Sequence, residues 1–181
     1  FLTQGGCFVT PSMKNPKWEC DNLQNYEELF DSIKFDKIVT SFYSFDSYLS
    51  KVESERREEI AIRIVEYDAF LNRIKTEAKS VYIVLGEPRG NEFDPQMAVR
   101  NKLPDFITEE QARNSFIVLQ DTLIHLTELD GVTLIDPISH LCSNGICKTR
   151  NDSEGFFYRD KNHMRPWYAI KNMTYLDEIF L

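Results

Sequence analysis

No apolar run in this chain of 181 residues approaches the roughly 20 residues that a helix needs to cross a bilayer. The sequence also lacks an initiator Met, and its first residues carry no basic flank of the kind that opens a signal peptide. We therefore expect the chain to be a segment of a longer protein.

Basic residues are in the minority, because 21 Lys and Arg face 29 Asp and Glu and give a formal net charge of -8. Such a chain repels phosphate backbones at long range, so we expect no nucleic-acid partner.

Internal repeats, low-complexity tracts and linkers are absent too. With 42% hydrophobic residues, the length suits one core. We predict a single domain over residues 1–181.

Cysteine is scarce, and its spacing is not the CxxC repeat of a zinc ribbon. The four cysteines form two local pairs, Cys7 with Cys20 and Cys142 with Cys147. A glycine in the turn-prone stretch 142–147 lets the chain double back, which favours local disulfides. Four free thiols, or a zinc site completed by His140 or His163, are the alternatives. Two disulfides would place the domain in an oxidising compartment such as a periplasm.

Helical and strand patterns alternate along the chain. Apolar and β-branched runs predict strands at 37–43, 80–85 and 132–135, with 80–85 in the centre of the sheet. Three- and four-residue apolar spacing predicts helices at 26–34, 53–79, 108–129 and 167–180. Thr108 and Gln111 have the spacing of a capping box. Alternating helices and buried strands predict an α/β fold, a three-layer α/β/α sandwich with a parallel sheet.

Asp160 and His163 form the sharpest pattern of reactive residues. A short Asp-x-x-His turn can aim the carboxylate at one imidazole nitrogen and leave the other facing a cleft. The carboxylate then fixes the tautomer and stabilises the imidazolium that forms when histidine deprotonates a serine, as in a Ser-His-Asp triad. A capped turn with a surface histidine is the alternative for this pattern taken alone.

Three segments in order resemble the SGNH domains that are fused to acyltransferase-3 membrane proteins, among them O-antigen acetyltransferases. Residues 136–164 resemble the end of those domains, residues 84–95 their middle, and residues 6–20 their first cysteine loop. The resemblance covers nearly the whole chain. It implies that Asp160 and His163 are the acid and base of a catalytic triad, and that the fold is SGNH hydrolase-like.

The chain departs from that family pattern in two places. The family's nucleophile lies in a Gly-Asp-Ser motif, and this tripeptide is absent here. Because the motif precedes the first cysteine loop in the family, we expect it, with the first strand of the sheet, upstream of Phe1. The family's oxyanion donors also have no clear counterpart, and residues 41–44 occupy the expected position. The chain alone is therefore expected to be inactive.

The resemblance implies an enzyme that transfers an acyl group, acetyl above all, to a hydroxyl of a cell-surface polysaccharide or lipid-linked sugar. The membrane acyltransferase domain of the same chain would supply the acyl group at the periplasmic face of a bacterial inner membrane, without a cofactor. A catalytically inactive carbohydrate-binding or interaction remnant is the alternative. Glu87 and Arg89 could hold a substrate carboxylate or hydroxyl, with a solvated charged loop as the alternative. Trp167 and Tyr168 could wall a sugar site, with a place in the core as the alternative. His140 could orient the nearby cysteine loop, and we interpret His125 as a packed or half-exposed helix residue.

Overall fold

The computed structural model describes residues 28–41, 57–114 and 131–181, with the side chains of its long helix described from residue 65 onward. The described residues group into two compact units, one of residues up to 83 with residues 131–134, the other of residues 84–114 and 135–181. The prediction of one domain over residues 1–181 stays a prediction. The elements of the first unit are β1 (Phe35–Ser41), α3 (Arg57–Glu77), β2 (Ala78–Val84) and β4 (Val132–Ile135).

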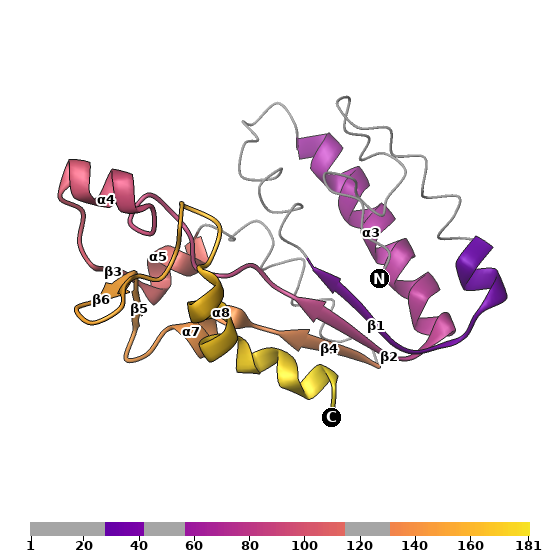
Figure 1. Cartoon of the computed structure of the whole chain (residues 1–181). Coiled ribbons are helices and arrows are strands. Elements are labelled where there is room, and N and C mark those ends of the chain that lie inside the picture. Colours follow the sequence, from indigo (N-terminus) through magenta and orange to yellow (C-terminus); the bar gives the residue numbers. More distant parts are fainter. Residues whose placement is uncertain (1–27, 42–56, 115–130) are drawn as a thin grey trace. The chain divides into compact units, whose positions relative to one another are not determined.

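These three strands form a parallel sheet in the order β1-β2-β4, so β2 is central among the described strands (Figure 1). The amide of Val81 donates to the carbonyl of Gly131 at 3.1 Å and ties β2 to the start of β4. Val81 and Ile83 of β2 are completely buried, as a central strand requires. The predicted α/β class and the central position of residues 80–85 are confirmed.

Helix α3 runs beside the sheet (Figure 1). Its residues Tyr67, Leu71 and Ile74, three and four positions apart, are all buried, so the apolar stripe predicted for this helix forms the contact with the core. The helix ends at Glu77 and β2 begins at the next residue, two positions before the predicted boundary. The predicted helical residues 53–56 lie outside the described chain.

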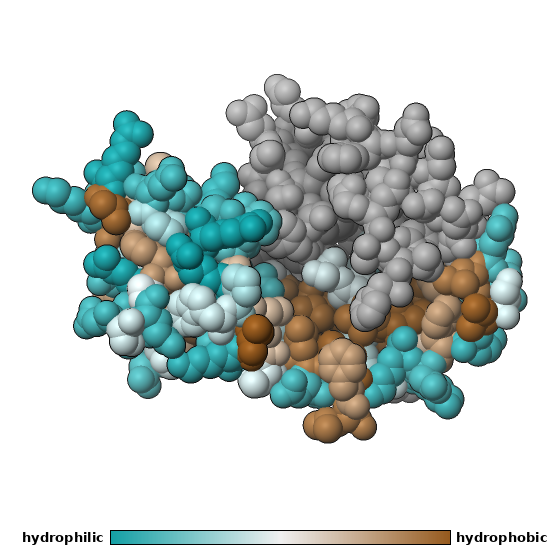
Figure 2. All heavy atoms as spheres, viewed as in Figure 1, coloured by the Kyte–Doolittle hydropathy of each residue, from teal (hydrophilic) through white to brown (hydrophobic). Residues whose placement is uncertain are grey.

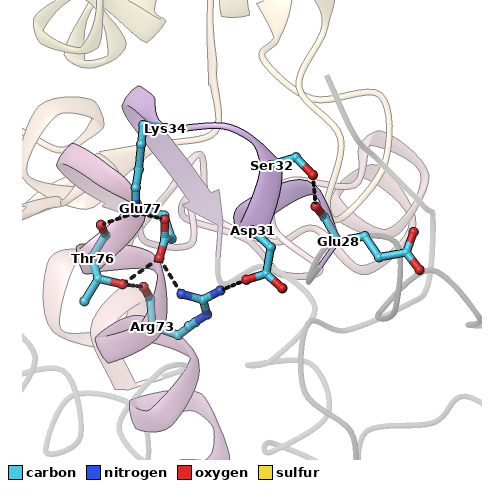
Figure 3. Close-up of polar contacts among 7 residues, drawn as sticks. All are labelled: Glu28, Asp31, Ser32, Lys34, Arg73, Thr76 and Glu77. Carbon is cyan, nitrogen blue, oxygen red and sulfur yellow. Dashed lines mark hydrogen bonds and ion pairs between the residues drawn. The ribbon is translucent and has the colours of Figure 1, made fainter.

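A network of ion pairs holds the end of α3 against the start of β1 (Figure 3). The Glu77 side chain is only 5% exposed and contacts both Lys34 and Arg73. Arg73 also contacts Asp31, and the Thr76 hydroxyl donates to Glu77 at 2.9 Å. Two cations therefore neutralise the buried carboxylate, and helical residues 28–32 are fastened to α3 through the same network.

The second unit is built from short elements. Two antiparallel pairs, β3 with β5 and β6 with β7, flank a core in which Tyr168 stacks on Phe157 with ring centroids 4.2 Å apart. The surface around α4 and β6 is largely hydrophilic in Figure 2. The elements are α4 (Pro95–Asn101), β3 (Phe106–Thr108), α5 (Glu109–Asn114), α7 (Pro137–Leu141), β5 (Ile146–Lys148), β6 (Arg150–Asn151), β7 (Gly155–Phe156), α8 (Pro166–Asn172) and the 3₁₀ helix η2 (Met173–Ile179).

The predicted helix at 108–129 begins with a capping box in the structure. At the start of α5, the Thr108 amide donates to the Gln111 side chain at 2.8 Å and the Gln111 amide to the Thr108 hydroxyl at 3.0 Å, so the capping box is confirmed. The rest of that helix, 115–129, lies outside the described residues.

The predicted helix 167–180 divides into α8 and η2. At the junction the Asn172 side chain bonds the Tyr168 carbonyl, and asparagine competes in this way with regular helix.

Candidate active site

The segment between β7 and α8 doubles back on itself and carries the predicted catalytic pair. Tyr158 and Met164 form an antiparallel bridge across it, and the Arg165 amide donates to the Phe157 carbonyl at 2.8 Å. Inside the bridge, the Arg159 amide donates to the His163 carbonyl at 2.9 Å. This closes residues 159–163 into a tight loop, hereafter the Asp-His turn.

Asp160 organises the Asp-His turn through its carboxylate. The Oδ1 atom accepts hydrogen bonds from the backbone amides of Asn162 and His163, both at 2.9 Å. The same carboxylate faces the imidazole, with Nδ1 of His163 2.9 Å from Oδ1 and 3.0 Å from Oδ2. The structure thus brings Asp160 and His163 together, with Nδ1 occupied and Nε2 left as the second ring nitrogen.

The electrostatics of the Asp-His turn keep this carboxylate ionised. The backbone amide of Asn162 is the largest influence that lowers the pKa of Asp160, and His163 adds to it against an opposing effect of desolvation. Arg159 Nε lies 3.5 Å from Oδ2 on the other side. The His163 side chain is 57% exposed and that of Asp160 41% exposed, so a hydroxyl can approach the ring from solvent.

Glu87 and His140 each lie next to Tyr175 of η2. Glu87 follows β2 and accepts a hydrogen bond from the Tyr175 hydroxyl of η2 at 3.3 Å. Burial raises the pKa of Glu87, and burial together with the Glu87 charge raises the pKa of Tyr175. The exposed His140 ring of α7 lies 5.5 Å from the Tyr175 ring, centroid to centroid. Arg89, on the same loop as Glu87, is half-buried.

The remaining predicted residues are placed as follows. Tyr168 is buried, and the partly buried Trp167 packs edge-on against Phe157, so both side chains contribute to the core. His125, Cys7 and Cys20 lie outside the described residues, as do three of the four residues, 42–44, expected where oxyanion donors would lie.

Cys142 and Cys147 form a disulfide that links the end of α7 to β5. Within residues 28–41, 57–114 and 131–181, no group of three or more His, Cys, Asp or Glu side chains could hold a metal ion. The same residues contain no helix that is long and apolar enough to span a membrane.

Two polar contacts of the second unit were not predicted from the sequence. Gly90 donates its amide to the carbonyl of Lys161 in the Asp-His turn at 3.1 Å. Asp136 caps α7 and pairs with Arg113 at 2.9 Å. Burial acts to raise the pKa of Asp136, but bonds from Ser139 and Arg113 outweigh it and the pKa is lowered. Gly90 could have been suspected from the Pro-Arg-Gly-Asn turn sequence, whereas nothing local links Arg113 to Asp136.

Comparison with known proteins identifies the family. No curated protein and no solved structure matches the chain. Residues 1–171 match the family described as SGNH domain (fused to AT3 domains), which is nearly the full length. The chain therefore belongs to these SGNH domains, a hydrolase-like family associated with membrane acyltransferases.

Proposed function

We propose that the intact protein transfers an acyl group, acetyl, from a donor supplied by its membrane acyltransferase part to a hydroxyl of a cell-surface polysaccharide. The observation that carries this proposal is the Asp160 carboxylate held 2.9 Å from Nδ1 of a solvent-accessible His163. Because the 181 residues contain no Gly-Asp-Ser tripeptide, the nucleophilic serine comes from outside this chain.

In the first half of the reaction, Nε2 of His163 takes the serine proton while the serine oxygen attacks the acyl carbonyl. The leaving group of the donor departs with that proton, and an acyl-serine forms. In the second half, Nε2 deprotonates the acceptor hydroxyl, which attacks the acyl-serine, and the proton returns to the serine oxygen. Asp160 holds the ring and stabilises the transient imidazolium throughout.

The disulfide of the second unit supports a location in an oxidising compartment, and we propose the periplasmic face of a bacterial inner membrane. The hydrophilic surface around α4 and β6 is compatible with a water-soluble polysaccharide as the acyl acceptor (Figure 2).

Substitutions in the intact protein test this function. His163→Ala and Asp160→Asn should each lower ester turnover of p-nitrophenyl acetate and acetylation of surface polysaccharide by about 10²- to 10⁴-fold. The amide oxygen that Asp160→Asn introduces can still accept the backbone bonds of the turn, so the melting temperature should hold. His140→Ala, at an exposed histidine of the same unit, is the matched control and should stay active. Full activity of His163→Ala would refute the assignment.

A second candidate is a non-catalytic carbohydrate-binding module, favoured by the absence of the Gly-Asp-Ser tripeptide. The coding sequence upstream of Phe1 discriminates between the two. A Gly-Asp-Ser tripeptide preceded by membrane spans supports the transferase, and a start codon directly before Phe1 supports the binding module.

A further inference from the structure

The Asp-His turn is held mostly by its own atoms. Within the described residues, the hydrogen bonds of residues 160–163 stay inside the turn with one exception. That exception is the Lys161 carbonyl, which accepts the Gly90 amide at 3.1 Å. Lys161 lies between Asp160 and His163, so this bond fixes the middle of the turn from a segment about 70 positions earlier in the chain.

The segment that supplies this bond is the loop of residues 86–94, between β2 and α4. Gly90 has φ +142°, a conformation that side-chain-bearing residues rarely adopt, and a Cβ there would meet Glu92 Oε2 at 3.0 Å. The Phe93 amide donates to the Gly90 carbonyl at 3.1 Å and closes the loop on itself. Both ends of the loop are anchored, by Glu87 on Tyr175 and by Asp94 as the N-cap of α4.

A second contact joins the loop to the same turn through side chains. The Phe93 ring, 1% exposed, lies 4.6 Å from the Tyr158 ring, centroid to centroid. Tyr158 directly precedes the Asp-His turn and bridges to Met164 directly after it. The loop therefore contacts the turn at two points: Phe93 packs against Tyr158 at its base, and the Gly90 amide bonds Lys161 at its centre.

We propose that Gly90 is a positioning residue for His163: its amide holds the Lys161 carbonyl, and the loop thereby sets the orientation of the imidazole against Asp160. This rests on the proposed function. General-base transfer depends steeply on geometry, and a displacement of about 1 Å can cost about 100-fold in rate. A side chain at position 90 strains the backbone at φ +142°, and we expect the strained loop to shift and to weaken its bond to the Lys161 carbonyl.

The test compares Gly90→Ala with Gly145→Ala in the intact protein. Gly145 also has positive φ, +76°, but a Cβ there meets nothing within 4 Å, so it controls for backbone strain. Hydrogen exchange followed by mass spectrometry should show faster exchange of residues 159–164 in Gly90→Ala alone. Its kcat for p-nitrophenyl acetate should fall about 10- to 100-fold with KM within about twofold, while Gly145→Ala keeps its kcat.

Unchanged exchange and kcat in Gly90→Ala would overturn the proposal, as would equal losses of kcat in both variants. If Gly90→Ala does not fold, hydrogen exchange of the native protein decides, because the Gly90 amide must be protected when it is bonded to the Lys161 carbonyl. A Gly90 amide that exchanges as fast as an unbonded one would also overturn the proposal. Full turnover by His163→Ala would instead defeat the proposed function, while the exchange measurement would still decide whether the loop holds the turn.

Discussion

Two carboxylates of the second unit show how local surroundings decide the chemistry of the same functional group. Asp160 accepts two backbone amides and faces an imidazole, and its pKa is lowered. Glu87 receives one hydroxyl bond from Tyr175, and burial raises its pKa. The first is therefore fixed as an anion in the turn, whereas the charge of the second costs free energy of folding.

Replacement of Glu87 by Gln should stabilise the protein at neutral pH. A raised pKa means that the folded state binds more protons than the unfolded state between pH 4.5, the ordinary value, and the higher folded pKa. The native protein thus loses stability as pH rises through that window. Gln keeps the acceptor for the Tyr175 hydroxyl without the charge.

Chemical denaturation at pH 7 and pH 4 checks this prediction. The Glu87→Gln variant should exceed the native protein in free energy of unfolding at pH 7, and the two should converge at pH 4. A variant less stable than the native protein at pH 7 would contradict the prediction, because it would show that the charge of Glu87 makes an interaction that offsets its burial.

Among the elements, those with a long periodic pattern were predictable and those of two or three residues were not. Strand 132–135 was predicted at its observed bounds, and the Thr108 capping box marked the start of α5. Strands β3, β5, β6 and β7 are too short to show alternation, and their pairing depends on residues distant in sequence. The turn sequence around Gly90 is visible locally, but its bond to the Lys161 carbonyl depends on the fold and not on its neighbours.

The disulfide between Cys142 and Cys147 stabilises the short elements that it joins. It closes a loop with a sequence separation of 5, for which loop-closure entropy predicts a contribution of about 2 kcal/mol. Cys147 pairs with Ile107 across β3 and β5, and the Gly145 carbonyl accepts the Glu109 amide at the start of α5 at 2.8 Å. Opening the loop should therefore loosen β3, β5 and the start of α5 together.

The double variant Cys142→Ala/Cys147→Ala should lower the free energy of unfolding by about 2 kcal/mol. Denaturation of the native protein with and without reductant provides the matched comparison. We expect reductant to lower the stability of the native protein more than that of the double variant, in which only the predicted Cys7–Cys20 bridge is left to reduce. No effect of reductant on the native protein would contradict the prediction.

At the scale of the whole molecule, more of the described carboxylates have a lowered pKa than have, like Glu87, a raised one. The Lys34 contact is the largest influence that lowers the pKa of Glu77, and Asp136 and Asp160 are lowered too. Such groups bind fewer protons in the folded state, so their stabilisation is complete above ordinary values of 3.8 to 4.5 and is lost as pH falls through the folded pKa.

Thermal unfolding should therefore begin at a lower temperature at pH 3.5 than at pH 7. Glu77→Gln should show a smaller difference between the two pH values, because it lacks one of the groups that titrate. Asp31→Asn serves as the control, since its side chain is 72% exposed and shares the same partner, Arg73. A melting temperature that rises on acidification would contradict the prediction.

The class of fold and the proximity of Asp160 to His163 were accessible from the sequence because both leave local signals, namely buried strand runs and a four-residue Asp-x-x-His spacing. Contacts between segments far apart left no such signal. The network of Lys34, Arg73 and Glu77 and the bond from Gly90 to Lys161 both join residues separated by about 40 positions or more. Charge and glycine are common in any loop, so neither residue type points to its partner.

The openness of the His163 side chain has a consequence for product distribution. In the proposed reaction, an imidazole that solvent reaches will activate a water molecule as readily as a sugar alcohol. Each acyl-serine would then partition between wasteful hydrolysis and productive transfer. The yield of acylated carbohydrate per donor consumed should rise with the concentration of acceptor. It should level off when bound carbohydrate excludes water from the His163 ring.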